Sequence, residues 1–303
     1  MADLSVRICG VEFKNPIIPA SGVFGYGREY AQFYDLSRLG GIAAKGTTPK
    51  KQNGNPAPRI AETPAGILNS VGLRNPGMDA FLTEELPWLL QQDTVILANF
   101  AGASPELCAE SAAKLDRTDV QMLELNISCP NVKNGGLAFG ADPKTAAGMV
   151  KAVRAATKKP LVVKLSPNVT DITEIARAVE AEGADAVSLI NTLLGMRIDL
   201  RSRRPILRNN TGGLSGPAVF PVAVRMVWQV ANTVKIPVIG MGGVQSGKDA
   251  AELMMAGASA VQVGTAIVAD PYAPLRIIDE LNDWLDENGI ATAAELTHTV
   301  KAW

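Results

Sequence analysis

The sequence predicts an α/β fold, a (β/α)8 TIM barrel with an N-terminal β-hairpin and long loops on its catalytic face. Eight short apolar runs alternate with helical patterns along the chain, and each run is apolar on both faces. This pattern is typical of parallel strands covered by helices. Eight strands close a barrel, and 303 residues suit one barrel with insertions. An open doubly wound sheet is the alternative.

The order of elements follows from apolar runs and helix start signals. The eight strands are expected at Ile17–Ala20, Gly41–Lys45, Thr94–Phe100, Gln121–Ile127, Leu161–Leu165, Ala186–Asn191, Pro237–Gly240 and Ala260–Val263. A hairpin is expected at Val6–Ile8 and Val11–Phe13, around Cys9-Gly10. Helices are expected to begin at the pairs Ser104-Pro105, Asp142-Pro143, Gly216-Pro217 and Asp270-Pro271, and at the capping box Ser246–Asp249. No linker is visible, so residues 1–303 are expected to form a single domain.

Composition excludes several classes of protein. The net charge of −1 gives no field that favours nucleic acid or a membrane surface. No apolar run approaches the roughly 20 residues of a membrane span, and the first residues do not resemble a signal peptide. Three widely spaced cysteines, Cys9, Cys108 and Cys129, form neither a disulfide framework nor a metal pair. We therefore expect a cytoplasmic protein with no metal centre and with reduced thiols.

Three connections that follow strands are unusually long. They run from Gly46 to Asn75, from Ser128 to Asp142 and from Leu193 to Ser215. Loops after strands lie on the catalytic face of a barrel. The second loop carries Cys129 directly after a strand and before a Gly-rich segment, where a thiol can serve as a base. The third carries five arginines between positions 197 and 208, which fits a solvated surface turn.

Glycines end the last two expected strands. Gly242-Gly243 follows the seventh strand, and Gly264-Thr265 follows the eighth. Barrels often bind phosphate with these two loops, because glycine lets backbone N–H groups approach the phosphate oxygens. Simple tight turns are the alternative. The segment from Gly242 to Lys248 resembles a P-loop, but Asp249 stands where that motif needs Ser or Thr. No G-x-G-x-x-G segment opens a strand–helix unit, so we expect no dinucleotide site.

Polar side chains end several of the apolar strands. They are Lys45, Asn99, Asn126, Lys164 and the pair Asn191-Thr192. A lysine in a buried parallel strand is costly unless it meets a partner. Two such lysines indicate an anionic or electron-rich ligand, and several asparagines, each both donor and acceptor, suit a planar ring that bears an imide. The only histidine, His298, lies far from every motif, which argues against a Ser-His-Asp or Cys-His hydrolase.

Along nearly its whole length the chain resembles the dihydroorotate dehydrogenase family. The resemblance rests on the paired glycines above and on three segments: Lys45-Gly46-Thr47, Asn69–Gly77 and Asn126–Asn131. It implies that FMN lies at the barrel mouth with dihydroorotate stacked on it. Cys129 matches the catalytic base of the soluble branch of the family. The membrane-bound branch uses serine there and carries an N-terminal extension, and neither feature is present in this sequence.

The resemblance also assigns residues and partners. It implies FMN contacts for Ser21, Lys45, Gly46, Asn99, Asn126, Lys164, Ile190, Gly216, Gly242, Gly243, Gly264 and Thr265. It implies dihydroorotate contacts for Lys45, Asn69, Ser70, Val71, Gly72, Leu73, Asn126, Asn191 and Thr192. The segment Val132–Gly136 is similar to the NAD-linked subclass. That subclass pairs a homodimer of this chain with subunits carrying FAD and a [2Fe–2S] cluster, as a heterotetramer.

The cysteine count agrees with a separate electron carrier. A [2Fe–2S] cluster takes four cysteine ligands, and this chain has three cysteines, so electrons that reach NAD must pass through another chain. Three alternatives stay open. One is a single-subunit enzyme that uses fumarate, and another is a reductase like dihydropyrimidine dehydrogenase, in which a histidine commonly follows Cys-Pro where Asn131 stands here. The third is a flavin-binding subunit that only relays electrons.

Overall fold

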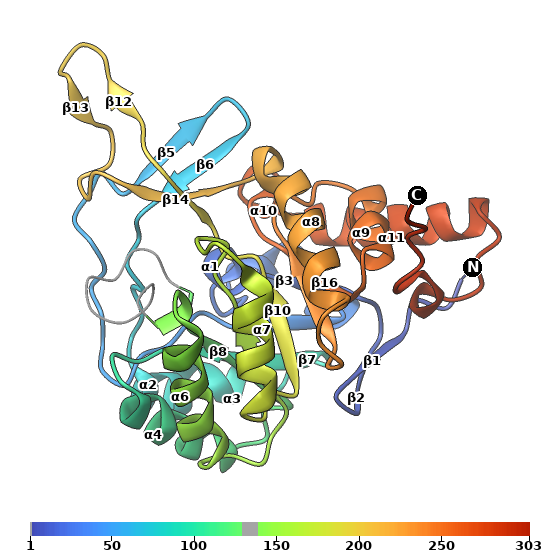
Figure 1. Cartoon of the computed structure of the whole chain (residues 1–303), viewed down its shortest axis with the longest axis horizontal. Coiled ribbons are helices and arrows are strands. Elements are labelled where there is room, and N and C mark those ends of the chain that lie inside the picture. The colour runs from blue at the N-terminus through green and yellow to red at the C-terminus, as the bar shows by residue number, and fades with distance from the viewer. Residues whose placement is uncertain (1, 129–138) are drawn as a thin grey trace.

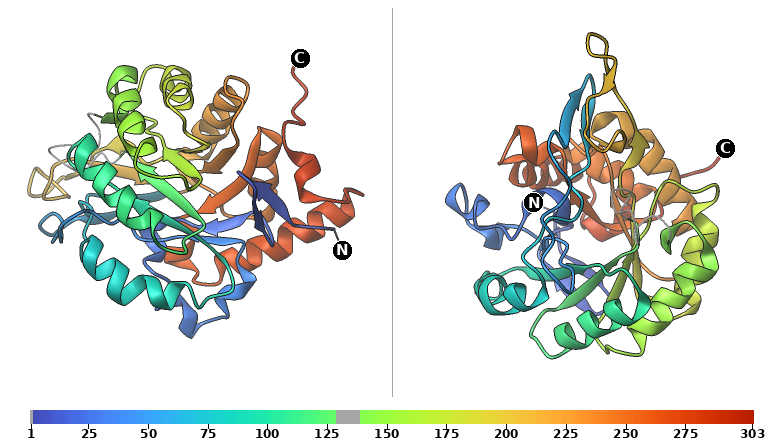
Figure 2. Two further views of the ribbon diagram at one scale, coloured as in Figure 1. Left: turned by 90° about the horizontal axis from the view of Figure 1, so that it is seen from below. Right: turned by 90° about the vertical axis from the view of Figure 1, so that its left-hand side faces the viewer.

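The computed structural model describes residues 2–128 and 139–303. Its centre is one parallel sheet of eight strands in the order β3-β16-β15-β10-β9-β8-β7-β4. The sheet curls round until its two ends meet (Figure 2), where the N–H of Gly40 donates to the carbonyl of Ile17 at 3.1 Å. The prediction of a barrel is therefore confirmed, and the open sheet is excluded. Cys129 and the predicted Gly-rich segment lie outside the described residues.

All eight predicted barrel strands are present, with ends that differ by one or two residues. The barrel strands are β3 (Ile17–Pro19), β4 (Gly41–Ala43), β7 (Val95–Phe100), β8 (Met122–Asn126), β9 (Leu161–Lys164), β10 (Ala186–Leu189), β15 (Val238–Met241) and β16 (Ala258–Val263). The last strand starts two residues before its predicted start. Most strand residues are fully buried, as expected for a sheet with a packed interior and helices outside.

Helices cover the outside of the barrel (Figures 1 and 2). The longer ones are α4 (Pro105–Asp116), α6 (Pro143–Arg154), α7 (Ile172–Ala181), α8 (Phe220–Ala231), α9 (Gly247–Met255) and α11 (Ala273–Glu287). Shorter pieces are α1 (Ser21–Phe24), η1 (Tyr30–Gln32), η2 (Leu36–Arg38), α2 (Met78–Ala80), η3 (Phe81–Glu85), α3 (Leu86–Leu89), η4 (Pro217–Val219), α10 (Ala266–Ala269) and η5 (Ala293–Leu296). Among the described residues, no helix is long and apolar enough to cross a membrane.

Most predicted helix starts are confirmed, and one differs by two residues. Ser104 and Asp142 cap α4 and α6 with their side chains, and Ser246 forms the expected capping box of α9. Gly216-Pro217 opens the short helix η4, which leads into α8. At Asp270-Pro271, Asp270 accepts the N–H of Tyr272 at 2.9 Å, and the helix begins two residues later than predicted. Helix α11 then begins at Ala273.

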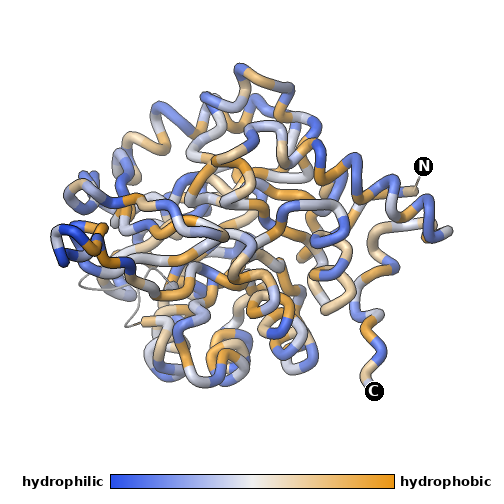
Figure 3. The backbone as a smooth tube through the Cα atoms, turned by 90° about the horizontal axis from the view of Figure 1, so that it is seen from above, coloured by the Kyte–Doolittle hydropathy of each residue, from blue (hydrophilic) through white to orange (hydrophobic). Residues whose placement is uncertain are grey.

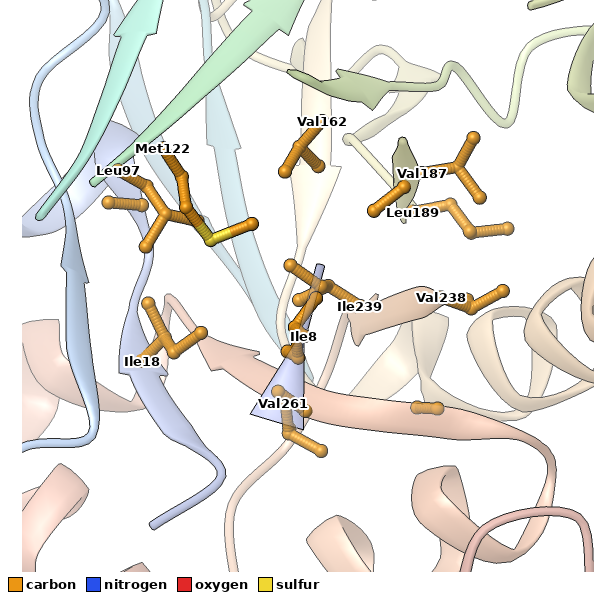
Figure 4. Close-up of a cluster of buried hydrophobic side chains, with 14 of the residues drawn as sticks. Ile8, Ile18, Leu97, Met122, Val162, Val187, Leu189, Val238, Ile239 and Val261 are labelled. Carbon is orange, nitrogen blue, oxygen red and sulfur yellow. The ribbon is translucent and has the colours of Figure 1, made fainter. Parts of the chain in front are cut away.

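The hairpin of β1 (Val6–Ile8) and β2 (Val11–Phe13) is present as predicted. The thiol of Cys9 donates to the carbonyl of Asp185, which directly precedes β10, at 3.2 Å. The hairpin thus packs at the N-terminal ends of the barrel strands. Ile8 is fully buried and lies beside Ile239 (Figure 4). The other end of the barrel is left for ligand binding.

A second sheet, which the sequence analysis missed, stands over the C-terminal ends of the barrel strands (Figure 1). Its four antiparallel strands lie in the order β11-β14-β6-β5. They are β5 (Ile60–Thr63), β6 (Gly66–Asn69), β11 (Leu193–Gly195) and β14 (Gly212–Ser215). Pairing of Leu214 with Leu68 joins two of the predicted long loops. A projecting hairpin of β12 (Ile198–Asp199) and β13 (Arg204–Pro205) carries the arginines.

Apolar side chains fill the barrel and the layer between strands and helices, while the projecting hairpin is largely hydrophilic (Figure 3). Figure 4 shows buried side chains of several strands: Leu97 and Met122 lie together, and Leu189 lies apart from them beside Val187. Close packing of this kind fixes the relative positions of the strand ends. The side chains at those ends therefore face one another in a defined geometry.

Candidate active site

A cavity with a volume of about 740 Å³ lies at the C-terminal ends of the barrel strands. Residues from the ends of β3, β7, β8, β9, β10, β15 and β16 line it, and so do residues of the second sheet. This is the end at which barrel enzymes carry their chemistry. A cavity of this size takes a ligand of about the size of a cofactor.

Most residues singled out from the sequence meet in this cavity. The predicted FMN contacts that line it are Ser21, Lys45, Gly46, Asn99, Asn126, Lys164, Ile190, Gly242, Gly243, Gly264 and Thr265. The predicted dihydroorotate contacts that line it are Lys45, Asn69, Val71, Gly72, Leu73, Asn126, Asn191 and Thr192. Gly216 and Ser70 do not line it, and Ser70 is fully buried behind the wall. Cys129 lies outside the described residues.

The glycines after β15 allow a close approach of backbone segments. A side chain at Gly243 would place its Cβ 2.7 Å from the Cβ of Phe220 and 2.9 Å from the carbonyl oxygen of Gly216. Gly243 also has φ of +84°, which side chains rarely adopt. Gly216 therefore packs behind the Gly242-Gly243 turn and supports it. Nearby, the Thr265 hydroxyl donates to the Ser215 hydroxyl at 2.8 Å.

A chain of hydrogen bonds connects the ends of β8 and β10. The side-chain oxygen of Asn126 accepts the N–H and the hydroxyl of Ser128 at 3.1 and 2.8 Å. Asn191 donates its amide to the Ser128 hydroxyl at 2.8 Å. Lys164, whose side chain is buried, lies beside Asn126 in the register of β9 against β8. The side chains of Asn126, Asn191 and Lys164 thus line the same cavity.

One asparagine shapes the loop that forms another wall. Asn75 accepts hydrogen bonds from the N–H of Thr48 and the N–H of Gly77, and it donates to the carbonyl of Leu73 at 2.6 Å. Its side chain is buried. Because these contacts tie three parts of the segment 48–77 together, they fix Val71, Gly72 and Leu73 at the mouth.

Below the cavity lies a buried polar cluster that the sequence analysis missed. Glu124 of β8 is fully buried and accepts hydrogen bonds from Asn99, Ser188 and Gln262. Polar residues inside apolar runs were the signal that pointed to Lys164. The same signal is present at Glu124, Ser188 and Gln262, so the pattern alone could have found them.

The two described thiols are not part of the site. Burial raises the pKa of Cys9 to about 11 and the pKa of Cys108 to about 12. Cys108 is buried on the inner face of α4, as expected for a core residue. The five arginines of the projecting segment are exposed, which agrees with a solvated surface turn. Within the described part of the chain, no group of three His, Cys, Asp or Glu could hold a metal.

Comparison with known proteins decides the family. The family profile "Dihydroorotate dehydrogenase" matches residues 3–285. The chain belongs to the dihydroorotate dehydrogenase family. It is 56% identical over 296 residues to "Dihydroorotate dehydrogenase B (NAD(+)), catalytic subunit" of Geobacillus sp. (strain WCH70), covering 97% of this chain and 95% of that protein. Proteins of the same name from Geobacter metallireducens (strain ATCC 53774 / DSM 7210 / GS-15) and Bacteroides thetaiotaomicron (strain ATCC 29148 / DSM 2079 / JCM 5827 / CCUG 10774 / NCTC 10582 / VPI-5482 / E50) are 57% and 55% identical, covering 97% and 98% of each chain.

Membership of the dihydroorotate dehydrogenase family implies FMN, and the cavity residues fit it. Among the described residues, the side-chain oxygens of Asn99 and Gln262 are buried without a hydrogen-bond partner. An unpartnered buried acceptor of this kind suits a ligand N–H. Apolar wall residues, including Ile190 and Met241, suit the faces of a flat ring. The segments Gly242-Gly243 and Gly264-Thr265 suit a phosphate group.

Proposed function

We propose that this chain is the catalytic subunit of an NAD-linked dihydroorotate dehydrogenase and oxidises dihydroorotate to orotate in pyrimidine synthesis. The observation that carries the proposal is the cavity in which Lys45, Asn126, Lys164 and Asn191 meet at the barrel mouth. Near-full-length identity with proteins named "Dihydroorotate dehydrogenase B (NAD(+)), catalytic subunit" supports the subclass. We place the enzyme in the cytoplasm and treat residues 1–303 as one domain.

Side chains of this cavity can hold both ligands. FMN bound here supplies the acceptor for the hydride that leaves C6 of dihydroorotate. We assign the binding of the FMN phosphate to the backbone of Gly243, Gly264 and Thr265. The buried ammonium of Lys164 stabilises negative charge that develops on the ring. Asn126 and Asn191, held through Ser128, then fix the polar edge of the pyrimidine.

We assign to Cys129 the removal of the proton from C5 of dihydroorotate. This carbon is acidified by the neighbouring carbonyl group, so a thiolate can remove its proton. Cys129 follows β8 by three residues, and Asn126 at the end of that strand lines the cavity. This short separation from β8 is the reason for assigning Cys129 to the substrate side of the mouth. We assign Lys45, Asn69, Val71, Gly72 and Leu73, which line the cavity, to the rest of the substrate side.

The electrons are proposed to leave through a second subunit. The chain has no dinucleotide fingerprint and only three cysteines, whereas a [2Fe–2S] cluster takes four. FAD and the cluster are therefore assigned to a partner, and a homodimer of this chain forms the core of a heterotetramer. The exposed arginines between positions 197 and 208 are a candidate contact with that partner.

Uptake of FMN followed by anaerobic reduction tests the proposal directly. The purified chain should carry FMN that is released by denaturation, and dihydroorotate should bleach the flavin absorbance without any partner. A folded protein that takes up no added FMN, or whose bound FMN stays oxidised with dihydroorotate, would contradict the proposal. Dihydrouracil in place of dihydroorotate separates the rival reductase activity, because it lacks the carboxylate.

A further inference from the structure

The buried cluster below the cavity is unusual in its donors and acceptors. Glu124 is reached by the side-chain nitrogen of Asn99 at 2.5 Å, that of Gln262 at 2.7 Å and the Ser188 hydroxyl at 2.8 Å. These groups come from β7, β16 and β10 and meet β8 inside the barrel. All four side chains are almost completely buried. All three partners are donors, so the Glu124 carboxylate is the acceptor in each of these hydrogen bonds.

The orientation of both amides follows from this arrangement. A carboxylate only accepts hydrogen bonds, so Asn99 and Gln262 each turn their nitrogen toward Glu124. Their oxygens then point away from Glu124, and both residues line the cavity. Within the described chain, neither oxygen has a partner. A Cβ on Gly46, another cavity residue, would lie 2.7 Å from the Asn99 oxygen.

We propose that Glu124 is a positioning residue that turns this end of the cavity into a surface of hydrogen-bond acceptors. Through Asn99 and Gln262 it selects a ligand that offers a ring N–H of the imide type. FMN and the pyrimidine substrate both carry such a group, so the inference rests on the proposed function and names the chemistry that they share. Buried acceptors that lack a partner are costly, and a ligand N–H removes that cost.

Replacement of Glu124 by Gln tests this idea without changing volume. The new amide has one oxygen and one nitrogen, so it faces either Asn99 or Gln262 with a donor. The residue that meets the donor must turn its own oxygen inward and present its nitrogen to the cavity. One acceptor for the ligand thus becomes a donor, which repels a ring N–H.

The readout is the ligand proton itself. Protein reconstituted with ¹⁵N-labelled FMN, and separately protein with ¹⁵N-labelled orotate, is measured by proton–nitrogen NMR and by binding titration. We expect the ring N–H of one of these ligands to exchange slowly in the wild-type protein. In Glu124→Gln the same proton should exchange at least about tenfold faster, and that ligand should bind about 10- to 100-fold more weakly, as expected for a lost buried hydrogen bond.

Two further variants separate positioning from a merely structural role. Ser188→Ala removes a donor to Glu124, but Ser188 does not line the cavity, so N–H exchange should stay within about twofold of wild type. Gln262→Met removes one acceptor at similar volume and should speed the exchange. This variant decides the matter if Glu124→Gln does not fold, as judged by circular dichroism of the FMN-free protein.

The outcomes distinguish the inference from the function. Protection of the FMN proton or of the orotate proton, lost in Glu124→Gln or Gln262→Met, supports the inference and says which ligand uses the acceptors. Unchanged exchange and affinity in the folded variants would overturn the inference and leave the proposed function standing. A wild-type protein that binds neither ligand would overturn both.

Discussion

At the scale of single residues, the proposed chemistry depends most on Cys129. Cys129→Ala should keep FMN and substrate binding, because the thiol is assigned to the proton and not to either ligand's affinity. Flavin reduction by dihydroorotate should slow by about 10²–10⁴-fold, the usual contribution of a general base. Cys129→Ser should also be slow and should recover as pH rises, since a hydroxyl ionises less readily than a thiol. Anaerobic stopped-flow absorbance measures both, and unchanged rates in Cys129→Ala contradict the assignment.

Gly46 tests how closely the cavity wall fits its ligand. A Cβ at this position would lie 2.7 Å from the side-chain oxygen of Asn99, so Gly46→Ala should displace that amide. We expect FMN affinity to fall by about tenfold, the effect of one weakened hydrogen bond. Gly148→Ala is the matched control, because Gly148 is exposed in α6 and its Cβ would meet nothing within 4 Å. Equal FMN affinity in the two variants would show that the wall tolerates the methyl group.

The two described thiols should react slowly with alkylating reagents, and the rate of this reaction should rise with pH. Burial raises the pKa of Cys9 to about 11 and that of Cys108 to about 12. At pH 8 their thiolate fractions are therefore about 10⁻³ and 10⁻⁴, and only the thiolate reacts. Alkylation by iodoacetamide, followed by mass spectrometry, should accelerate about tenfold per pH unit between pH 8 and pH 10. Rapid labelling of Cys108 in the native state at pH 8 would contradict these raised pKa values.

The raised pKa values of the two thiols also affect stability. The folded protein holds these protons more tightly than the unfolded chain, so the contribution to the free energy of unfolding is present below about pH 9 and is lost as pH rises through the raised pKa values.

At the scale of elements, the wall of the mouth depends on Asn75. This side chain joins Thr48, Leu73 and Gly77 by hydrogen bonds while it is buried. Asn75→Ala leaves several of these backbone groups without a partner, so the free energy of unfolding should fall by about 1–3 kcal/mol. The KM for dihydroorotate should rise more than kcat falls, because the loop is proposed to bind substrate and is assigned no base. Denaturant unfolding and steady-state kinetics measure the two effects. A loss of stability without any change in KM would separate the loop from substrate binding.

The second sheet explains why two long loops can form a precise wall. Segments 60–69 and 193–215 lie far apart in the sequence, yet β6 and β14 pair directly. This strand pairing gives the mouth of the cavity regular backbone hydrogen bonds in place of mobile turns. The projecting hairpin beyond this sheet carries the exposed apolar side chains of Ile198 and Leu200. Its arginines are also exposed, so the hairpin remains our candidate for contact with a partner.

At the scale of the whole molecule, the chain alone should not reduce NAD efficiently. It offers no G-x-G-x-x-G unit and no set of four cysteines. Its flavin should be reduced by dihydroorotate and reoxidised by artificial acceptors. Adding a partner that carries FAD and [2Fe–2S] should restore the formation of NADH, followed at 340 nm. Fumarate is the control acceptor, and rapid turnover with fumarate would favour the single-subunit alternative. Rapid NADH formation by the isolated chain, free of FAD and iron, would contradict the two-subunit proposal.

The sequence by itself determined the barrel and part of the cavity lining, and the family resemblance supplied further lining residues. Apolar runs separated by helix caps predicted all eight strands, because a parallel strand that is buried on both faces has no polar alternation. Lys45, Asn126 and Lys164 stood out since buried polar groups need partners. Local signals of this kind depend only on neighbouring residues. The start of α11 lies two residues after the predicted one, because Asp270 first forms a turn with Tyr272.

Only the tertiary structure decided how distant segments meet. The pairing of β6 with β14 depends on the barrel bringing two loops to the same edge, and no local pattern encodes their register. The position of Ser70 behind the wall, outside the cavity, follows from the same sheet. The contacts of Glu124 with Asn99 and Gln262 join three strands across the barrel. Each residue was visible in the sequence, but its partner is fixed by closure of the barrel, which is a property of the whole chain.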